Sequence, residues 1–318
     1  MRTNEKNGVL YIVVPCFNEQ EILIETAKRL KEKIELYLKN NKICEKSKIL
    51  FVDDGSKDNT WQIIENLHNN DDRYSGIKLS HNKGHQFALL AGLETANKYA
   101  DMTISIDADL QDDVDAIDKM IDLYYEGNDV VYGVRSSRKK DSFFKRFTAE
   151  SFYKIMTAAG TETVFNHADF RLMSKRAVNA LFEYTERNVY LRGIVPQLGF
   201  QSDKVEYERK KRTAGESKYP LKKMIALAIE GITSFSIKPL SFILTCALIF
   251  IFLGIMGFAV SLILFYTCDI EILWSFVSAL IFSTGIVLLA IGIIGVYVGK
   301  IYLETKCRPR YIIEKELV

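Results

Sequence analysis

The chain has 318 residues, a nearly balanced formal charge of +2 at pH 7 and a mean hydropathy of +0.01. These values average a charged N-terminal part with an apolar C-terminal third, so the net charge says little about partners. Five cysteines, an odd number without paired spacing, argue against a disulfide framework and a zinc site. Residues 1–8 are polar and precede only a strand-length apolar run, so no cleavable signal is expected.

Short apolar runs alternate with helical stretches over residues 9–134. Strands are predicted at residues 9–14, 48–52, 77–79, 102–106 and 130–134, and helices at residues 19–39, 60–67, 86–99 and 114–125. Alternation at this spacing predicts an α/β fold, with a mostly parallel sheet flanked by helices on both faces. In such sheets ligands bind beyond the carboxyl ends of the strands, where this sequence places its polar motifs.

Polar motifs follow the first two predicted strands. They are Pro15-Cys16-Phe17-Asn18-Glu19 and Asp53-Asp54-Gly55-Ser56-Lys57-Asp58-Asn59-Thr60. In a purely local interpretation, Asn18 caps one helix, and Asp58 or Asn59 caps the next after a glycine turn. Capping explains only one acid per helix and leaves Asp53 and Asp54 beside a buried strand without a role. A carboxylate there can accept hydrogen bonds from a nucleobase or from ribose hydroxyls.

A cluster of acids follows the predicted strand at residues 102–106. Two carboxylates one residue apart, Asp107 and Asp109, repel each other unless a cation lies between them. Hard oxygen ligands of this kind suit Mg²⁺ or Mn²⁺, so the pair indicates a site for a metal and a diphosphate. The alternative is a helix cap, in which Asp112 or Asp113 opens the helix at residue 114 and the other acids are solvated.

The C-terminal third contains two long uncharged runs, residues 239–268 and 272–299. Each exceeds the ~20 residues needed to cross a bilayer, which predicts a two-helix transmembrane hairpin; a buried helical hairpin in a soluble protein is the alternative. Basic residues flank the outer ends of the hairpin, whereas its turn carries only Asp269 and Glu271. The positive-inside rule therefore places both termini in the cytoplasm. Gly295 and Gly299 form a small-xxx-small pair that could pack the hairpin or join subunits of a homo-oligomer.

Five motifs, taken in order, resemble those of the family-two glycosyltransferases with a GT-A fold. They are Val14-Pro15-Cys16-Phe17-Asn18-Glu19, Val52-Asp53-Asp54-Gly55-Ser56, Asn82-Lys83-Gly84-His85-Gln86, Asp107-Ala108-Asp109-Leu110-Gln111 and Asp169-Phe170-Arg171-Leu172-Met173-Ser174. More narrowly, the chain resembles the polyprenyl-phosphate branch, which includes bactoprenol glucosyltransferases and dolichol-phosphate mannose synthases. The likeness covers nearly the whole chain, including residues 214–219, 230–236 and 308–311.

The resemblance implies roles for individual residues. The nucleotide sugar would be bound by Pro15, Asn18, Glu19, Asp53, Asp54 and Asp107. A divalent ion, Mg²⁺ or Mn²⁺, would be held by Asp107, Asp109 and Gln111. Phosphate groups would be bound by Arg135, Arg212 and Lys218, for which ordinary surface charge or contact with lipid headgroups is the alternative. Asp109 and Asp169 would be catalytic.

Two roles are open for Asp169. A sugar hydroxyl acceptor must lose a proton, so a carboxylate base is required for it. A lipid phosphate is already an oxyanion, and Asp169 would then orient Arg171, Lys218 or the metal. A cap or salt bridge ahead of a helix beginning near Ser174 is the structural alternative. His85 is expected at the N-terminus of a helix rather than as a catalytic imidazole.

The resemblance implies a domain organisation and an activity. A cytoplasmic GT-A catalytic domain (1–218) is followed by an amphipathic juxtamembrane segment (219–238), two transmembrane helices (239–268 and 272–299) and a basic tail (300–318). The 219–238 segment could instead be a core-facing helix. The expected reaction is inverting transfer of one hexose from a nucleotide-diphosphate sugar, UDP-glucose first and UDP-N-acetylglucosamine next, to undecaprenyl phosphate for cell-envelope glycosylation. The enzyme would be a multi-pass protein of the plasma or inner membrane, with no nucleic-acid partner.

Two other functions are weighed against this one. Two observations argue against a processive polysaccharide synthase. The sequence has no Gln-x-x-Arg-Trp motif, and two paired helices would leave little wall for a polymer channel. A non-catalytic membrane adaptor is opposed by the retention of Asp107, Asp109 and Asp169.

Overall fold

The computed structural model describes residues 7–136, 167–186, 190–208 and 273–317, together with some helical residues between 243 and 257. The chain divides into two compact units. The N-terminal unit comprises residues 1–157, 162–220 and 308–318, and the apolar unit comprises residues 158–161 and 221–307. The predicted juxtamembrane segment, residues 219–238, lies outside the described residues, as do Arg212 and Lys218.

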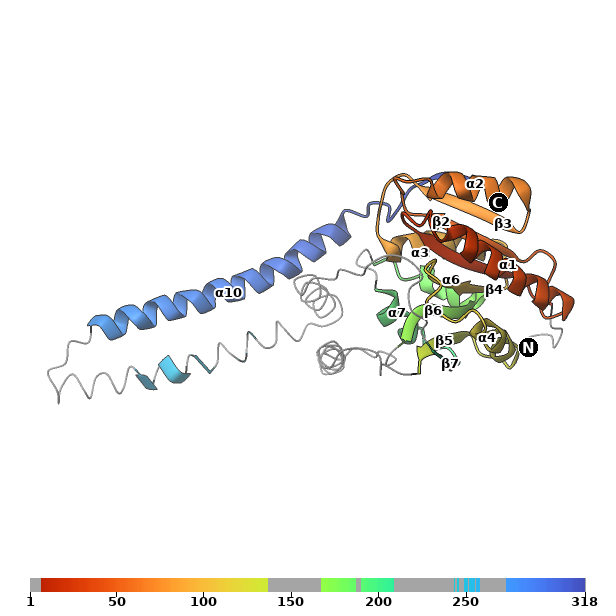
Figure 1. Cartoon of the computed structure of the whole chain (residues 1–318). Coiled ribbons are helices and arrows are strands. Elements are labelled where there is room, and N and C mark those ends of the chain that lie inside the picture. Colours follow the sequence, from red (N-terminus) through yellow and green to blue (C-terminus); the bar gives the residue numbers. More distant parts are fainter. Residues whose placement is uncertain are drawn as a thin grey trace. The chain divides into compact units, whose positions relative to one another are not determined.

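The N-terminal unit is built on one sheet with the strand order β7-β5-β6-β4-β1-β2-β3-β8 (Figure 1). Its strands are β1 (Leu10–Cys16), β2 (Lys48–Asp53), β3 (Tyr74–Leu79), β4 (Met102–Ser105), β5 (Val130–Arg135), β6 (His167–Ser174), β7 (Ser202–Tyr207) and β8 (Ile313–Leu317). The predicted parallel arrangement is confirmed for the central strands β4-β1-β2-β3. The complete sheet is mixed, because β6 runs antiparallel to β4 and β5, and β8 runs antiparallel to β3.

Helices cover both faces of this sheet. They are α1 (Leu23–Lys39), α2 (Thr60–Asn70), α3 (His85–Asn97), α4 (Ala116–Tyr125), α6 (Lys175–Phe182) and α7 (Leu191–Gln197). The strands and helices predicted over residues 9–134 are all present, with their ends shifted by a few residues. Neither β6 nor β8 was predicted, whereas the helix expected near Ser174 is α6, which Ser174 caps by accepting a hydrogen bond from the Ala177 backbone N–H at 3.1 Å.

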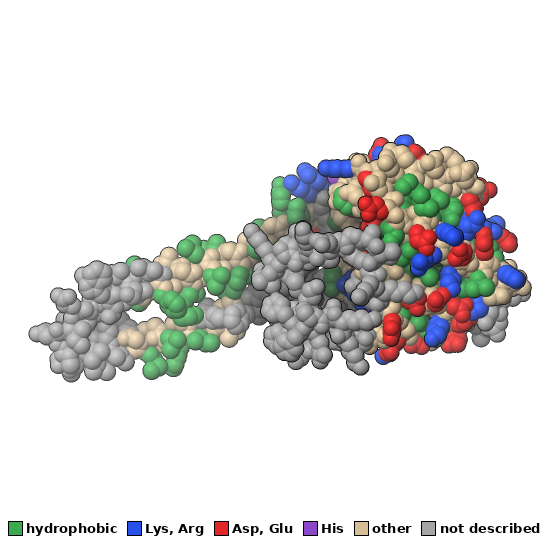
Figure 2. Space-filling view, in the orientation of Figure 1, with side chains coloured by type: hydrophobic (Ala, Val, Ile, Leu, Met, Phe, Trp, Pro, Cys, Tyr) green, Lys and Arg blue, Asp and Glu red, His purple; other side chains and the backbone are tan. Residues whose placement is uncertain are grey.

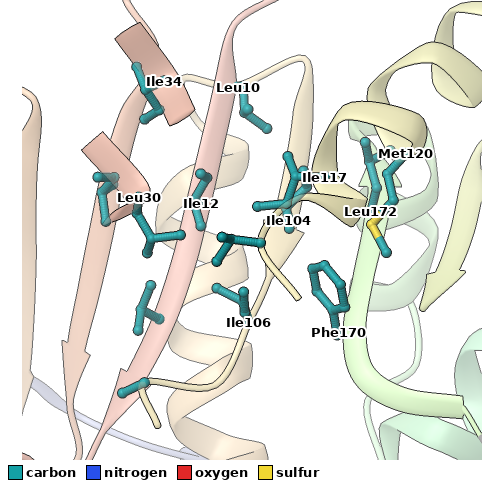
Figure 3. Close-up of a cluster of buried hydrophobic side chains, with 14 of the residues drawn as sticks. Leu10, Ile12, Leu30, Ile34, Ile104, Ile106, Ile117, Met120, Phe170 and Leu172 are labelled. Atoms are coloured by element: carbon teal, nitrogen blue, oxygen red, sulfur yellow. The ribbon is translucent and has the colours of Figure 1, made fainter. Parts of the chain in front are cut away.

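Side-chain alternation along β1 assigns the helices to the two faces. Ile12 and Val14 point into the main core cluster, to which α1, α2 and α4 contribute (Figure 3). Val13 points to the other face, where α3 approaches so closely that a Cβ on Gly92 would lie 2.3 Å from Val13 Cγ1 and 2.7 Å from Val52 Cγ2. A glycine is therefore required where α3 packs on β1 and β2.

The same alternation orients β6. Phe170 and Leu172 are buried in the core cluster beside Ile104 and Met120 (Figure 3). Residues two apart in a strand share a face, so Asp169 and Arg171 lie on the opposite face of β6 from this core.

The apolar unit contains α10 (Leu273–Thr305), a helix of 33 residues. Within it, the most apolar window of 18 residues in Phe282–Thr305 has a mean hydropathy of 2.3, and none of that window is buried. Figure 2 shows hydrophobic side chains along this unit. Over the described parts of the chain, α10 is the one helix long and apolar enough to cross a bilayer. The run 239–268 lies mostly outside the described residues, but Phe250 within it packs edge-on against Phe282, with ring centroids 5.5 Å apart.

Candidate active site

Polar side chains gather at the edge where β1, β2 and β4 end. These strands are parallel, so their carboxyl ends meet at one edge of the sheet. Strand β6 runs the other way and begins there, with Arg171 opposite Ser105 of β4. Because β6 runs antiparallel to β4, Asp169 near the start of β6 lies at the same edge of the sheet as Asp53 and Asp107.

The loops after β1 and β2 are joined by hydrogen bonds. Asn18 has a positive φ of 54°, donates from its backbone N–H to Ser56 Oγ at 3.0 Å, and accepts from the Lys57 N–H at its side-chain Oδ1 at 2.9 Å. Asn18 does not cap α1, whose N-cap residue is Ile22. The N-cap position of α2 is Asn59, one of the two residues predicted, but its side chain makes no capping hydrogen bond; the preceding Asp58 accepts the Thr60 N–H at 3.0 Å instead.

Asp54 supports the loop that precedes α3. Its two oxygens accept the backbone N–H groups of Lys83 at 2.7 Å and Gly84 at 2.8 Å. Beside it, Gly55 has a φ of 68°, and a Cβ there would lie 2.6 Å from the Asn82 nitrogen. The loop after β2 is thus pressed against the loop after β3, and Asp54 fixes the start of α3.

Asp53 differs from its neighbour. The side chain is fully buried, and its Oδ1 accepts the Ser56 N–H at 3.2 Å. Among the described residues, Oδ2 has no hydrogen-bond partner, although it too is buried. Burial raises the pKa of this carboxyl above its ordinary value, despite the hydrogen bonds from Ser56 and the charge of Lys78. A buried acceptor without a partner is a place where a bound ligand could donate a hydrogen bond.

The acids after β4 are crowded. Burial raises the pKa of Asp107, and the charges of Asp169 and Asp109 raise it further, whereas His85 opposes the rise. Gln111 is buried, and its backbone N–H donates to Asp109 Oδ1 at 3.1 Å. Within the described residues, no three His, Cys, Asp or Glu side chains form a group that could hold a metal by themselves. Mg²⁺, however, is usually held by one or two carboxylates and substrate phosphates, and a cation would relieve the charge crowding, so Asp107 and Asp109 fit such an ion.

The capping alternative for Asp112 is wrong. Helix α4 begins at Ala116, after Asp115, whereas Asp112 is buried and accepts a hydrogen bond from the Tyr207 hydroxyl at 2.5 Å. Arg135, at the end of β5, lies 3.8 Å from the same oxygen through its Nη2. Burial, together with the charge of Asp107, raises the pKa of Asp112 to about 6. Asp112 therefore lies close to Arg135, the predicted phosphate-binding residue, and also interacts with the charge of Asp107.

Asp169 lies between two guanidinium groups. Arg171 Nη2 donates to Oδ1 at 2.7 Å, and Arg192 of α7 donates from Nη2 to Oδ2 at 2.9 Å. Burial alone would raise the pKa of Asp169, but Arg192, His85 and Arg171 together hold it well below its ordinary value. Contact with Arg171 is one of the three alternatives that the orienting role for Asp169 offered. Arg192 was not identified from the sequence.

The N-terminus of α3 completes the cluster. His85 begins α3, as expected, after Gly84 with a φ of 93°. Its Nε2 nevertheless lies 3.6 Å from both Asp107 Oδ1 and Asp169 Oδ2. Burial lowers the pKa of this imidazole, but its two acidic neighbours raise it more, so it is held above its ordinary value. Gln86 follows, and its Nε2 donates to Asp169 Oδ2 at 3.4 Å.

The sheet and the acids at its edge define an α/β protein with a polar site at the carboxyl ends of parallel strands, and sequence comparison identifies its family. Residues 11–182 match the family described as Glycosyl transferase family 2. The uncharacterized glycosyltransferase YkoT of Bacillus subtilis (strain 168) is 48% identical, over 98% of this chain and 93% of that protein. The bactoprenol glucosyl transferase of Shigella phage SfV is 38% identical, over 96% of this chain and 98% of that protein. This chain therefore belongs to glycosyltransferase family 2, as the order of its motifs predicts.

The solved structures found by comparison are less similar to this chain. The mannosyltransferase PcManGT from Pyrobaculum calidifontis, solved in complex with GDP-Man and Mn²⁺, is 14% identical. The match covers 72% of this chain and 71% of that chain, with a TM-score of 0.44.

Proposed function

We propose that this glycosyltransferase moves a single hexose, with inversion, from a nucleotide-diphosphate sugar to a polyprenyl phosphate. UDP-glucose is the favoured donor and undecaprenyl phosphate the favoured acceptor. The product would be a lipid-linked sugar for glycosylation of the cell envelope. The similarity to a protein named bactoprenol glucosyl transferase, over nearly the full length of both chains, supports the acceptor class. The observation that carries the proposal is the buried Asp169 carboxylate, held between the guanidinium groups of Arg171 and Arg192.

The donor would occupy the edge formed by β1, β2 and β4. The buried Oδ2 of Asp53 can accept an N–H of the nucleobase, while Asp54 supports the neighbouring loop. Asp107, Asp109 and Gln111 would hold a divalent ion, which would supply Lewis-acid stabilisation to the leaving diphosphate. Arg135 would contact the diphosphate from the end of β5.

The acceptor chemistry follows from the state of Asp169. A general base must be able to take up a proton near the working pH, and a carboxylate with a strongly lowered pKa is a poor one. A phosphate acceptor carries its own negative charge and needs positive charge and orientation instead. The paired guanidinium groups supply both, which favours a phosphate over a sugar hydroxyl as the nucleophile.

A membrane location is supported by α10 and by the position of β8 in the sheet. Strand β8 follows α10 in the chain and pairs with β3 of the N-terminal unit. If α10 crosses the bilayer, the chain must cross a second time before α10, because β8 and β3 must lie on the same side. The uncharged run 239–268 is long enough for that crossing. We therefore propose a two-helix hairpin in the plasma membrane, with the N-terminal unit in the cytoplasm.

The proposal is tested by incubating the purified protein with undecaprenyl phosphate and labelled UDP-glucose, UDP-N-acetylglucosamine or GDP-mannose. Mass spectrometry should detect undecaprenyl phosphate carrying one hexose, in an amount that depends on added Mg²⁺ or Mn²⁺. Products carrying several sugars would instead indicate a processive synthase. Donor binding without any product from the whole panel would indicate the non-catalytic adaptor.

A further inference from the structure

We infer that Arg192 binds the phosphate of the acceptor and that Asp169 is the residue that positions it. This inference rests on the proposed function and names the residue that would select a phosphate over a hydroxyl. The sequence motifs assign no role to Arg192, which lies on α7, outside the segments that carry them.

The cluster places positive charge beside Asp169. Two guanidinium groups, those of Arg171 and Arg192, contact this one carboxylate. The three side chains together carry one excess positive charge, and Asp107 lies on the far side of His85, whose Nε2 is 3.6 Å from both acids. A guanidinium group has five N–H donors, so Arg192 can bind a phosphate oxygen while it keeps its contact with Asp169.

Accessibility selects Arg192 over Arg171. The side chain of Arg171 is 2% exposed and that of Asp169 is 6% exposed, whereas that of Arg192 is 35% exposed. Arg171 also donates from Nη1 to the Leu191 carbonyl at 3.2 Å, so it faces the interior of the unit. A ligand arriving from solvent can therefore reach Arg192 but not Arg171.

The backbone next to Arg192 is fixed by hydrogen bonds to both polar groups of Leu191. The Leu191 N–H donates to Gln86 Oε1 at 3.1 Å, and the Leu191 carbonyl accepts from Arg171. The Leu191 side chain is 1% exposed. The guanidinium is fixed in turn, because its Nε lies 3.2 Å from both oxygens of Asp169. Arg192 is thus oriented before the acceptor arrives, which reduces the entropy lost on binding.

The expected consequence is discrimination by charge. A planar guanidinium matches the oxygens of a phosphate monoester, and a charge-assisted hydrogen bond to phosphate is about twice as strong as a neutral one. An isoprenoid alcohol offers no such anion. The site should therefore bind a prenyl phosphate more tightly than the corresponding alcohol, and Arg192 should account for the difference.

The test uses the full-length protein in detergent, with farnesyl phosphate and farnesol as probes and calorimetry as the measurement. We expect Arg192→Gln to weaken farnesyl phosphate binding at least tenfold, to leave farnesol binding unchanged, and to keep the Kd for UDP-glucose within twofold. Arg192→Lys should recover part of the loss. Arg176→Gln is the matched control, because Arg176 also pairs with an aspartate, Asp129, but lies on α6 with its side chain 67% exposed.

Three outcomes would overturn the inference. In the first, Arg192→Gln binds farnesyl phosphate as tightly as the wild type. In the second, the variant loses UDP-glucose affinity to the same extent, which would place Arg192 on the donor. In the third, inorganic phosphate competes with farnesyl phosphate at equal concentration, which would indicate a site for free phosphate. If the wild type forms no lipid-linked sugar but still binds farnesyl phosphate through Arg192, the proposed function fails while the inference stands.

Discussion

Arg192 and Asp169 form a forked ion pair, in which Nε lies 3.2 Å from both carboxylate oxygens and Nη2 lies 2.9 Å from Oδ2. With Arg171 on the other side, this pair holds the pKa of Asp169 well below its ordinary value, against the effect of burial. Of the two roles that the sequence leaves open, this arrangement favours orientation of a cation, and the pH–rate profile of a variant tests that choice.

Asp169→Asn should lower kcat/KM by about two orders of magnitude, because Arg192 loses its orientation. The shape of the pH–rate profile should not change, since an orienting carboxylate contributes no ionisation near neutral pH. The measurement is the rate of lipid-linked product formation from pH 5 to 9 in both proteins. Disappearance of the acidic limb in the variant, with donor affinity unchanged, would show instead that Asp169 accepts a proton.

The buried Asp112 should make the folded protein less stable as the pH rises. Its pKa is about 6 in the folded state, compared with 3.8 for an unperturbed aspartate, so between these two pH values the folded state binds a proton that the unfolded state has released. The free energy of unfolding therefore falls as the pH rises from 3.8 to about 6, by roughly 3 kcal/mol from this group. In EDTA, Asp112→Asn should raise the melting temperature at pH 7.5 and lose this advantage near pH 4. A lower melting temperature for the variant at pH 7.5 would mean that its bond to Tyr207 outweighs the cost of burying the charge.

Asp109→Asn should reduce turnover by two to three orders of magnitude, because one of the two carboxylates that would hold the divalent ion becomes a neutral amide. EDTA should abolish the activity of the wild type, and added Mg²⁺ or Mn²⁺ should restore it. Circular dichroism and the melting temperature serve as controls for folding. Full activity of the wild type in EDTA would refute the metal assignment.

The proposed hairpin predicts which side of the membrane each segment occupies. In a background without native cysteines, an impermeant thiol reagent applied to intact cells should label Glu271→Cys, but neither Ser56→Cys nor Glu314→Cys. A membrane-permeant reagent should label all three variants and so controls for their accessibility. Labelling of Ser56→Cys from outside would place the N-terminal unit on the wrong side for a cytosolic nucleotide sugar.

The parts of the site that lie on parallel strands could be predicted from the sequence. Apolar runs of strand length, followed directly by acids, identify Asp53 and Asp107, because parallel strands present their carboxyl ends at one edge. The sequence of β6 carries no comparable signal, since Asp169 and Arg171 are charged residues inside a strand. They are accommodated there by pairing with each other, which depends on the fold and not on local preference.

Arg192 and His85 show a further limit of local patterns. Helix α7 is only seven residues long and contains Pro196, so it has no clear helical period. Its contact with Asp169 arises because Gln86 and Arg171 hold Leu191, and both contacts span distant parts of the sequence. His85 was placed correctly at a helix start, but its proximity to Asp107 follows from how α3 lies against the sheet.

Strand β8 also determines the order in which the molecule can be completed. Lys315 of β8 pairs with Glu65 of α2, which lies 250 positions earlier in the chain, and α10 is synthesised between them. Until the C-terminal segment returns, the outer edge of β3 presents unpaired backbone groups, which favour pairing with other chains. A chain whose apolar segments failed to bring residues 308–318 back to the N-terminal unit would keep this edge open. The last strand of the sheet can therefore close only after the apolar unit has been made, so that correct placement of that unit becomes a condition for finishing the catalytic fold.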